Sequence, residues 1–179
     1  YWNNSDRSTR EALLAGAPAL AMIGLLVGFY FLNWIPPVPL SMKFGGMYHE
    51  VKRAGDHFEL SYEKRWFQVW QRSNTTVAAD EPIYCFTAVF APVTLKTTVY
   101  HHWYYRSDKS KPFSHADKIP LKIAGGREGG YRAYTFKQGL DVGDWRVDVE
   151  TEDGRVIGRV PVHVEKRDDA SRSLTTIVY

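Results

Sequence analysis

The stretch WRVDVETEDGRVIGRVPVHV, residues 145–164, decides the fold class. In its first part Trp145, Val147 and Val149 alternate with charged residues, which predicts a strand with one buried and one wet face. The Asp-Gly pair at 153–154 then predicts a tight turn. Small or apolar residues alternate again after the turn, namely Val156, Gly158, Val160, Val162 and Val164. The stretch therefore predicts an antiparallel hairpin.

Short strand patterns also precede the hairpin at a spacing of about ten residues. They are IYCFTAVF (83–90), LKTTVYHHWYY (95–105), KIPLKI (118–123) and YRAYTF (131–136). The first is apolar on both faces, as in a covered central strand. The glycine-rich AGGREGG (124–130) is expected to be a turn, and RWFQVWQ (65–71) is compatible with either a strand or a short helix. We expect an immunoglobulin-like antiparallel β-sandwich.

The N-terminal part has a different pattern, because no residue from 12 to 42 is charged. As a helix, residues 12–35 would be about 36 Å long, enough to cross a hydrocarbon core of about 30 Å. Ser8 and Glu11 have the spacing of a capping box, which marks a helix start. A secretory signal has a shorter apolar region, and soluble core helices seldom continue this far without a charge. The sequence therefore predicts a single transmembrane helix.

The stretch FLNWIPPVPL (31–40) predicts how this helix ends. Trp34 is an aromatic residue suited to the level of the lipid headgroups. Pro36 and Pro37 remove backbone donors and disfavour a continuing helix, so the chain should leave the membrane there. The third proline, Pro39, continues this pattern and predicts a stiff, extended spacer after the helix.

These patterns divide the chain into five parts. We expect an N-terminal flank (1–11), a transmembrane helix (12–35), a proline-rich exit and connecting segment (36–80), a β-sandwich domain (81–166) and a C-terminal tail (167–179). The segment QRSNTTVAADEP (71–82) is expected to be a linker. Because the chain begins with Tyr1 and not methionine, we also expect that further sequence precedes it.

Composition excludes several classes of function. The 179 residues carry a formal net charge of only +3, without a basic stripe, which argues against a nucleic-acid partner. The single cysteine, Cys85, can form neither an internal disulfide nor a thiolate metal site by itself. His101 and His102 are adjacent on a predicted strand and point to opposite faces, so they cannot chelate one ion together. His101 is expected to be a hydrogen-bonded core histidine, and we expect no metal.

No pattern predicts catalysis. GGREGG lacks the Gly-Lys-Ser/Thr ending of a phosphate loop, and no signature of a nucleophilic serine or cysteine is present. Asp141, Asp144 and Asp148 are expected to be solvated on the wet face of their strand. We therefore expect a protein that is not an enzyme and has no cofactor.

Other residues predict contact with a partner. Small residues on the apolar helix, among them Gly16, Gly24 and Gly28, would let a second helix approach closely. The aromatic density around Trp66 and Trp70 exceeds the need of one sandwich core and favours a docking surface. The residues expected to bind a partner are Gly16, Gly24, Gly28, Trp34, Pro36, Pro37, Trp66 and Trp70.

Four segments together resemble a bacterial membrane-protein family known as domain of unknown function 2914. The matching positions are His101 or His102 with Trp103 and Tyr104, Gly126 and Arg127 with Tyr131 and Arg132, Trp145 to Val149, and Asp153-Gly154. The resemblance extends from about Ile35 to Val164. Family members usually have several spans, whereas this sequence predicts one. The resemblance implies membrane association and a β-rich module, and it implies no activity.

We expect a non-catalytic accessory or structural subunit that is anchored in the lipid bilayer and docks on a larger complex of integral membrane proteins. The alternative is a membrane-tethered module that binds a glycan or another cell-envelope ligand through exposed aromatic residues. The basic residues flanking the span do not decide its orientation. We expect the bacterial inner membrane, with the β-domain on the periplasmic side, because sandwiches on rigid proline exits are commonly envelope modules.

Overall fold

The computed structural model describes residues 5–32, 40–64, 72–93, 95–126, 129–166 and 173–179, with only the backbone described for residues 5–14. The chain consists of two compact units, Tyr1–Pro39 and Leu40–Tyr179. Trp34, Pro36, Pro37, Trp66 and Trp70, all predicted to bind a partner, lie outside the described residues.

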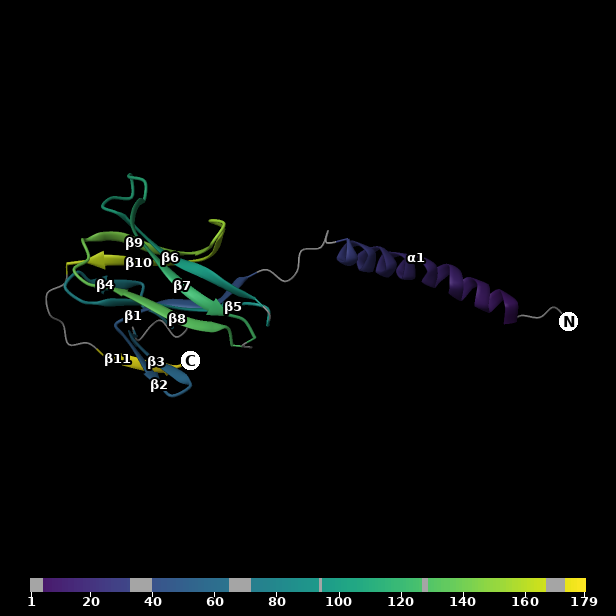
Figure 1. Ribbon diagram of the computed structural model, residues 1–179, viewed down its shortest axis with the longest axis horizontal. Helices are drawn as coiled ribbons and strands as arrows, with labels where there is room; N and C mark the ends of the chain where they lie inside the picture. Colours follow the sequence, from purple (N-terminus) through teal and green to yellow (C-terminus); the bar gives the residue numbers. More distant parts are fainter. Residues whose placement is uncertain (1–4, 33–39, 65–71, 94, 127–128, 167–172) are drawn as a thin grey trace. The chain divides into compact units, whose positions relative to one another are not determined.

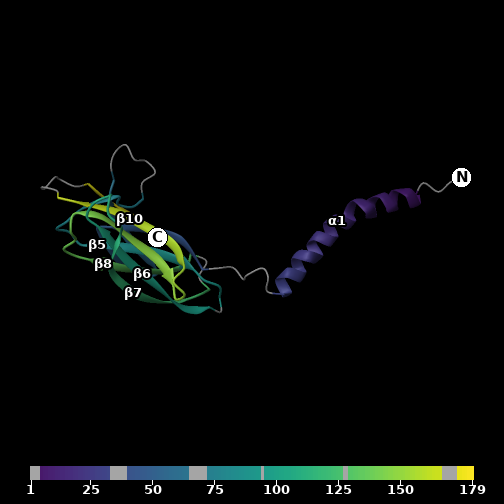
Figure 2. The same ribbon diagram turned by 90° about the horizontal axis from the view of Figure 1, so that it is seen from above.

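The first unit contains one helix, α1 (Ser5–Phe31). It begins earlier than the predicted start at residue 12, and residues 33–35 of the predicted span lie outside the described residues. Its axis bends (Figure 2), and Pro18 inside the helix accounts for the bend because proline lacks the amide proton of the helical hydrogen bond. Within the described residues, no helix combines the length and apolar character needed to cross a membrane. The transmembrane helix is therefore not confirmed.

The second unit is built from β-strands. The described strands are β1 (Ser41–Tyr48), β2 (Glu50–Ala54), β3 (His57–Glu63), β4 (Thr76–Ala78), β5 (Ile83–Phe90), β6 (Lys96–Arg106), β7 (Ser114–Ala124), β8 (Tyr131–Lys137), β9 (Gly143–Thr151), β10 (Val156–Glu165) and β11 (Leu174–Val178). They form three sheets, with the orders β1-β5-β8, β4-β10-β9-β6-β7 and β11-β3-β2. All pairs are antiparallel except β4 with β10. The expected class, mainly β with antiparallel sheets, is confirmed.

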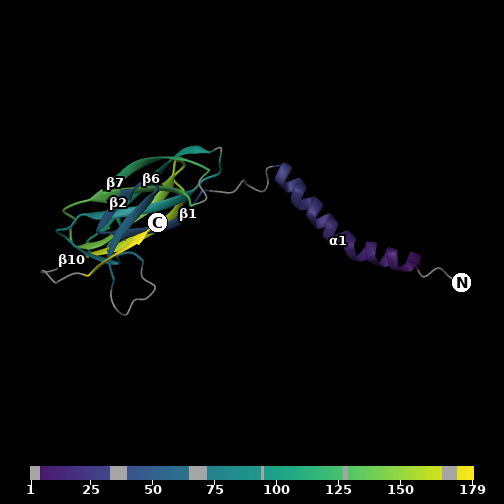
Figure 3. The same ribbon diagram turned by 90° about the horizontal axis from the view of Figure 1, so that it is seen from below.

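The three sheets are layers, and the sheet β1-β5-β8 is the middle one (Figure 1). Figures 2 and 3 show β6 and β7 side by side in the five-stranded sheet. Strand β5 explains the layering, because its alternate side chains enter two different cores. Ile83 and Cys85 pack towards the five-stranded sheet, whereas Phe86 packs towards β2 and β3. The prediction that residues 83–90 form a strand covered on both faces is confirmed.

The predicted hairpin is also present. Strands β9 and β10 pair antiparallel, with Trp145 opposite Val162 and Val147 opposite Val160. Gly154 has the positive φ of 82° that favours glycine, and its amide donates to the carbonyl of Thr151 over 2.9 Å. One detail differs from the prediction: the register shifts between Val156 and Gly158, so Val156 is exposed rather than buried.

The predicted domain boundaries of the β-region are too narrow. Residues 36–80 were expected to be a connecting segment, but they contain β1, β2, β3 and β4. The expected linker 71–82 contains β4, which pairs with β10. The expected tail 167–179 contains β11, which pairs with β3. The third layer therefore joins residues from both ends of the β unit.

Candidate functional site

His101 is buried between the middle and the five-stranded sheets, as predicted. Its Nε2 lies 2.8 Å from the hydroxyl of Thr87, and its Nδ1 lies 2.9 Å from the hydroxyl of Thr135. The indole of Trp103 donates to the same Thr135 oxygen over 3.2 Å. Burial lowers the pKa of His101 to about 4. The imidazole is therefore neutral at physiological pH and links two layers of the sandwich.

The opposite, outward face of the five-stranded sheet carries a charged cluster around Glu150. The side chain of Glu150 is only 8% exposed, although it lies on the face predicted to be wet. His102 Nδ1 lies 2.9 Å from Oε1, and Lys118 Nζ lies 3.1 Å from Oε2. Tyr104 donates a weaker hydrogen bond of 3.3 Å to Oε1. Burial acts to raise the pKa of Glu150, but the hydrogen bonds from His102 and Lys118 outweigh it, and the pKa lies below its ordinary value.

Two further carboxylates of β9 are neutralised on the same face. Asp148 is buried at 2% exposure, with Arg146 Nε 3.2 Å and Arg159 Nε 3.3 Å from its Oδ1. The expectation of a solvated Asp148 is wrong, because neighbouring positions on β9 and β10 place two guanidinium groups over it. Asp144 is half-buried and paired as well, whereas Asp141 is exposed as expected.

The side chain of Asp144, which belongs to β9, contacts side chains of the two neighbouring strands, β6 and β10. His163 Nδ1 lies 2.7 Å from its Oδ1, and Arg106 donates to its Oδ2 from Nε over 3.0 Å. The hydrogen bond from His163 and the contact with Arg106 lower the pKa of Asp144. Each of these three β9 carboxylates is therefore paired with cationic or imidazole groups on adjacent positions. Such a face suits recognition of charged groups better than proton transfer, because its carboxylates already have partners.

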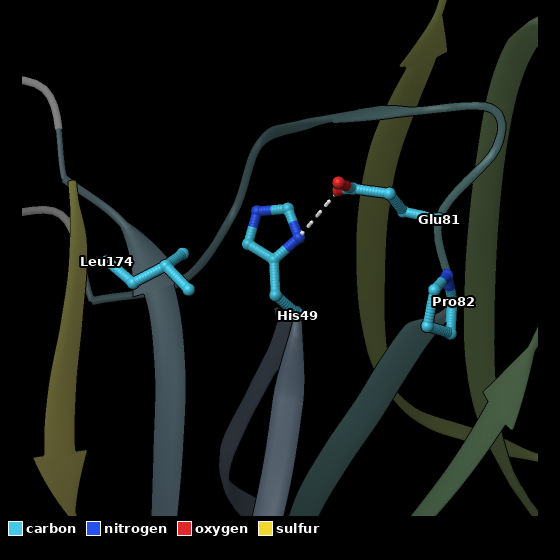
Figure 4. A pocket seen from close by; sticks show the side chains of 4 residues that line it. All are labelled: His49, Glu81, Pro82 and Leu174. Carbon is cyan, nitrogen blue, oxygen red and sulfur yellow. Dashed lines mark ion pairs between the residues drawn. The ribbon is translucent and has the colours of Figure 1, made fainter. Parts of the chain in front are cut away.

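A small pocket of about 180 Å³ lies where the β1–β2 connection meets the segment before β5 (Figure 4). His49, Glu81, Pro82 and Leu174 line it, and Figure 4 shows the imidazole of His49 directed at the carboxylate of Glu81. His49 Nδ1 lies 3.1 Å from Glu81 Oε2. The volume of this pocket is below that of ordinary ligand pockets. We therefore interpret the ion pair as a structural contact between the β1–β2 connection and the segment before β5, and not as a site for an organic ligand.

An aromatic cluster lies on the face of the middle sheet that is directed towards the sheet β11-β3-β2. Tyr84 of β5 stacks on Phe136 of β8 at 5.5 Å between ring centroids, and it lies 6.0 Å from Tyr134. Phe136 is 53% exposed and Tyr134 is 41% exposed. We call Tyr84, Tyr134 and Phe136 the aromatic ladder. The sequence pattern YRAYTF predicts a strand, but it contains no signal that the third sheet leaves this face of β8 partly uncovered.

The predicted contact residues that are described all lie on α1. Among the described residues, nothing lies within 4 Å of a Cβ atom added at Gly16, Gly24 or Gly28. The charged face of the five-stranded sheet is a cluster that sequence reasoning did not identify.

No group of three or more metal-ligating side chains lies together among the described residues. The sheets and surfaces described above define the class: in its described part, the chain is a layered β-sandwich protein with one charged and one aromatic surface. A family model described as "Protein of unknown function (DUF2914)" matches residues 96–164, which extend from β6 to β10. This match supports the family resemblance for the strands of the charged sheet that it includes. It does not include the segment from Ile35 to Leu95, and it does not test the expected membrane association.

Several solved structures are similar to this chain. An immunoglobulin-like protein from Pseudomonas aeruginosa, known from its crystal structure, is similar at 11% sequence identity and a TM-score of 0.38. The similarity covers 73% of this chain and 99% of that protein. No curated protein matches the chain significantly.

Proposed function

We propose that the protein is a non-catalytic accessory subunit, anchored in the bacterial inner membrane through α1, that docks on a complex of integral membrane proteins. The observation that carries this proposal is the exposure of α1. Its exposed large hydrophobic side chains are Leu20, Met22, Ile23, Leu25, Leu26, Val27, Tyr30 and Phe31. An apolar helix of this kind is stable only where lipid or another protein covers it.

The extent of the apolar region supports a membrane anchor. The absence of a spanning helix concerns the described residues, whereas the uncharged run of the sequence also includes residues 33–39 and the side chains at 12–14. Within α1 the glycines favour a protein neighbour in the membrane, because close helix approach depends on missing side chains. Both observations fit a helix that lies in lipid beside a partner helix.

The aromatic ladder supports a second contact, made by the β unit. Exposed aromatic side chains are enriched in protein interfaces, where they bury large areas at low entropic cost. In this proposal the ladder packs on an extramembrane surface of the same complex, on the periplasmic side. The ladder also favours the second candidate function, binding of a cell-envelope glycan, because aromatic faces stack on sugar rings.

Purification of the full chain from its native membrane in mild detergent tests the proposal. Stable co-migration with other integral membrane proteins is expected, and replacement of Phe136 by alanine should weaken it. As a control, Phe44→Ala removes an aromatic ring that packs on Phe86 and Tyr179, and it should affect folding rather than association alone. A monodisperse monomer that binds polysaccharide through the ladder would favour the glycan function instead.

A further inference from the structure

A second pocket, of about 300 Å³, lies at one end of the five-stranded sheet. It is formed by the end of β6, the loop from β6 to β7, the start of β9 and the middle of β10. Its residues are Thr75, Arg106, Lys109, Phe113, Asp144, Trp145, Pro161, Val162 and His163. This volume is at the lower end of the range for small-molecule sites, so a small metabolite-sized group fits and a large one does not.

Two cationic side chains and one imidazole, from three different elements, line this pocket. They are Arg106 of β6, Lys109 of the following loop and His163 of β10, against the single carboxylate of Asp144. Asp144 is already engaged, because Arg106 Nη2 lies 3.0 Å from Oδ2 and His163 Nδ1 lies 2.7 Å from Oδ1. Lys109 is exposed and forms no ion pair with the described residues. The pocket thus keeps unneutralised positive charge.

The guanidinium of Arg106 is held in place from two sides. The carboxylate of Asp144 accepts from Nε of Arg106 and pairs with its Nη2. The centre of the Phe113 ring lies 4.5 Å from Cζ of Arg106. Arg146 covers the same ring at 4.3 Å, which fixes Phe113 as well. A preorganised guanidinium loses little entropy when it binds an anion, and its remaining amino group is a hydrogen-bond donor. The arrangement is therefore prepared for an anionic group before any ligand arrives.

We propose that this pocket binds the phosphate group of a small organic ligand. Three converging cationic or imidazole groups suit a phosphate with nearly two negative charges better than a singly charged carboxylate. The apolar side chains of Phe113, Pro161 and Val162 line the remaining space, where a short organic body would lie. A soluble phosphate ester and a lipid headgroup share this chemistry. The proposal does not depend on how α1 is anchored.

Calorimetric titration of the full chain, in a detergent without charge, tests the proposal with glycerol 3-phosphate as the probe. Saturable binding is expected, whereas glycerol should not bind. Lys109→Ala should weaken binding about tenfold through the loss of one charge-assisted hydrogen bond. Lys111→Ala is the matched control: it lies in the same loop, its ammonium contacts the hydroxyl of Ser107, and it does not line the pocket. It should change the affinity less than about twofold.

The same titration with dihexanoyl phosphatidic acid separates the two sources of phosphate. Binding at least about tenfold tighter than glycerol 3-phosphate, with the same loss in Lys109→Ala, assigns the site to a lipid headgroup. Equal affinities assign it to a soluble phosphate ester. The proposal is overturned if neither probe gives saturable binding, or if Lys109→Ala binds as tightly as the unchanged chain while its tryptophan fluorescence shows an intact fold.

Discussion

The buried imidazole of His101 makes the stability of the β unit depend on pH. Burial lowers its pKa from 6.5 to about 4 in the folded protein. Above pH 6.5 the group is neutral in both states, so its contribution is complete there. As the pH falls from 6.5 to about 4, only the unfolded chain gains a proton, and stability should fall by about 3 kcal/mol. Denaturant unfolding at a series of pH values, followed by tryptophan fluorescence, measures this loss.

His101→Phe is the control for this prediction. It removes the titrating group and leaves the hydroxyls of Thr87 and Thr135 without the imidazole, so the variant should be less stable at pH 7. Its stability should nevertheless depend less on pH between 6.5 and 4 than that of the unchanged protein. Identical pH slopes in both proteins would contradict the assignment to His101.

Asp148 offers a second test with single residues. Asp148→Ala should lower the free energy of unfolding by about 2 kcal/mol, because Arg146 and Arg159 lose a buried partner but retain access to water. Asp141→Ala, at an exposed position of the same segment, should change it by less than about 0.5 kcal/mol. Equal effects of the two substitutions in chemical denaturation would show that Asp148 is solvated after all.

The sequence predicted some of these residues and not others. The core position of His101 follows from strand alternation, because Val99 and Trp103 lie on the same face. The burial of Asp148 depends instead on which cations the neighbouring strand presents, which requires the register of β9 with β10. Register between strands is set by packing and turn geometry together, so a single strand pattern cannot supply it.

Among the elements, β9 contributes a large side chain, Trp145, to the core. Trp145 is 7% exposed and packs in the core shared by the middle and five-stranded sheets, and its indole donates to the carbonyl of Asp141 over 2.9 Å. Trp145→Ala should cost about 3 to 5 kcal/mol and unfold the β unit at moderate temperature. Thermal unfolding followed by circular dichroism measures this, and a variant with unchanged melting would place Trp145 at an interface instead of in the core.

A substitution in α1 should have the opposite effect to Trp145→Ala: it should weaken association with a partner without unfolding the β unit. Gly24→Leu should reduce co-purification with the membrane partner while the β unit remains folded, because a Cβ atom at this position meets none of the described residues within 4 Å but the leucine would block a neighbouring helix. Ala15→Leu makes a similar addition on the helical face opposite Gly24 and should leave association intact. Loss of association in both variants, or in neither, would contradict a specific glycine-lined contact.

Elements with a strong local pattern were predicted well, and those without one were not. The hairpin of β9 and β10 has regular alternation and an Asp-Gly turn, and the structure contains it. The third sheet escaped prediction because β11 pairs with β3 from far along the chain, and burial along β3 does not alternate regularly. Its stability comes from the aromatic core around Tyr48 and Phe86, which is a tertiary property.

At the scale of the whole molecule, the two units differ in how far their own residues cover their apolar side chains. The β unit contains its own cores and requires no partner to bury them. The helix unit has the opposite character, because its large apolar side chains are exposed. The central claim of the proposed function is that lipid and a membrane partner cover these side chains.

Carbonate extraction of membranes that contain the full chain tests this claim most directly, together with the variant Leu25→Arg and the control Leu25→Ala. Arginine near the centre of a spanning helix costs about 2.5 to 3.5 kcal/mol on insertion scales, whereas alanine is tolerated. The account predicts that the unchanged chain and Leu25→Ala stay in the membrane pellet, while a large fraction of Leu25→Arg moves to the supernatant. Release of the unchanged chain by carbonate, or equal retention of all three proteins, would contradict an anchor formed by α1.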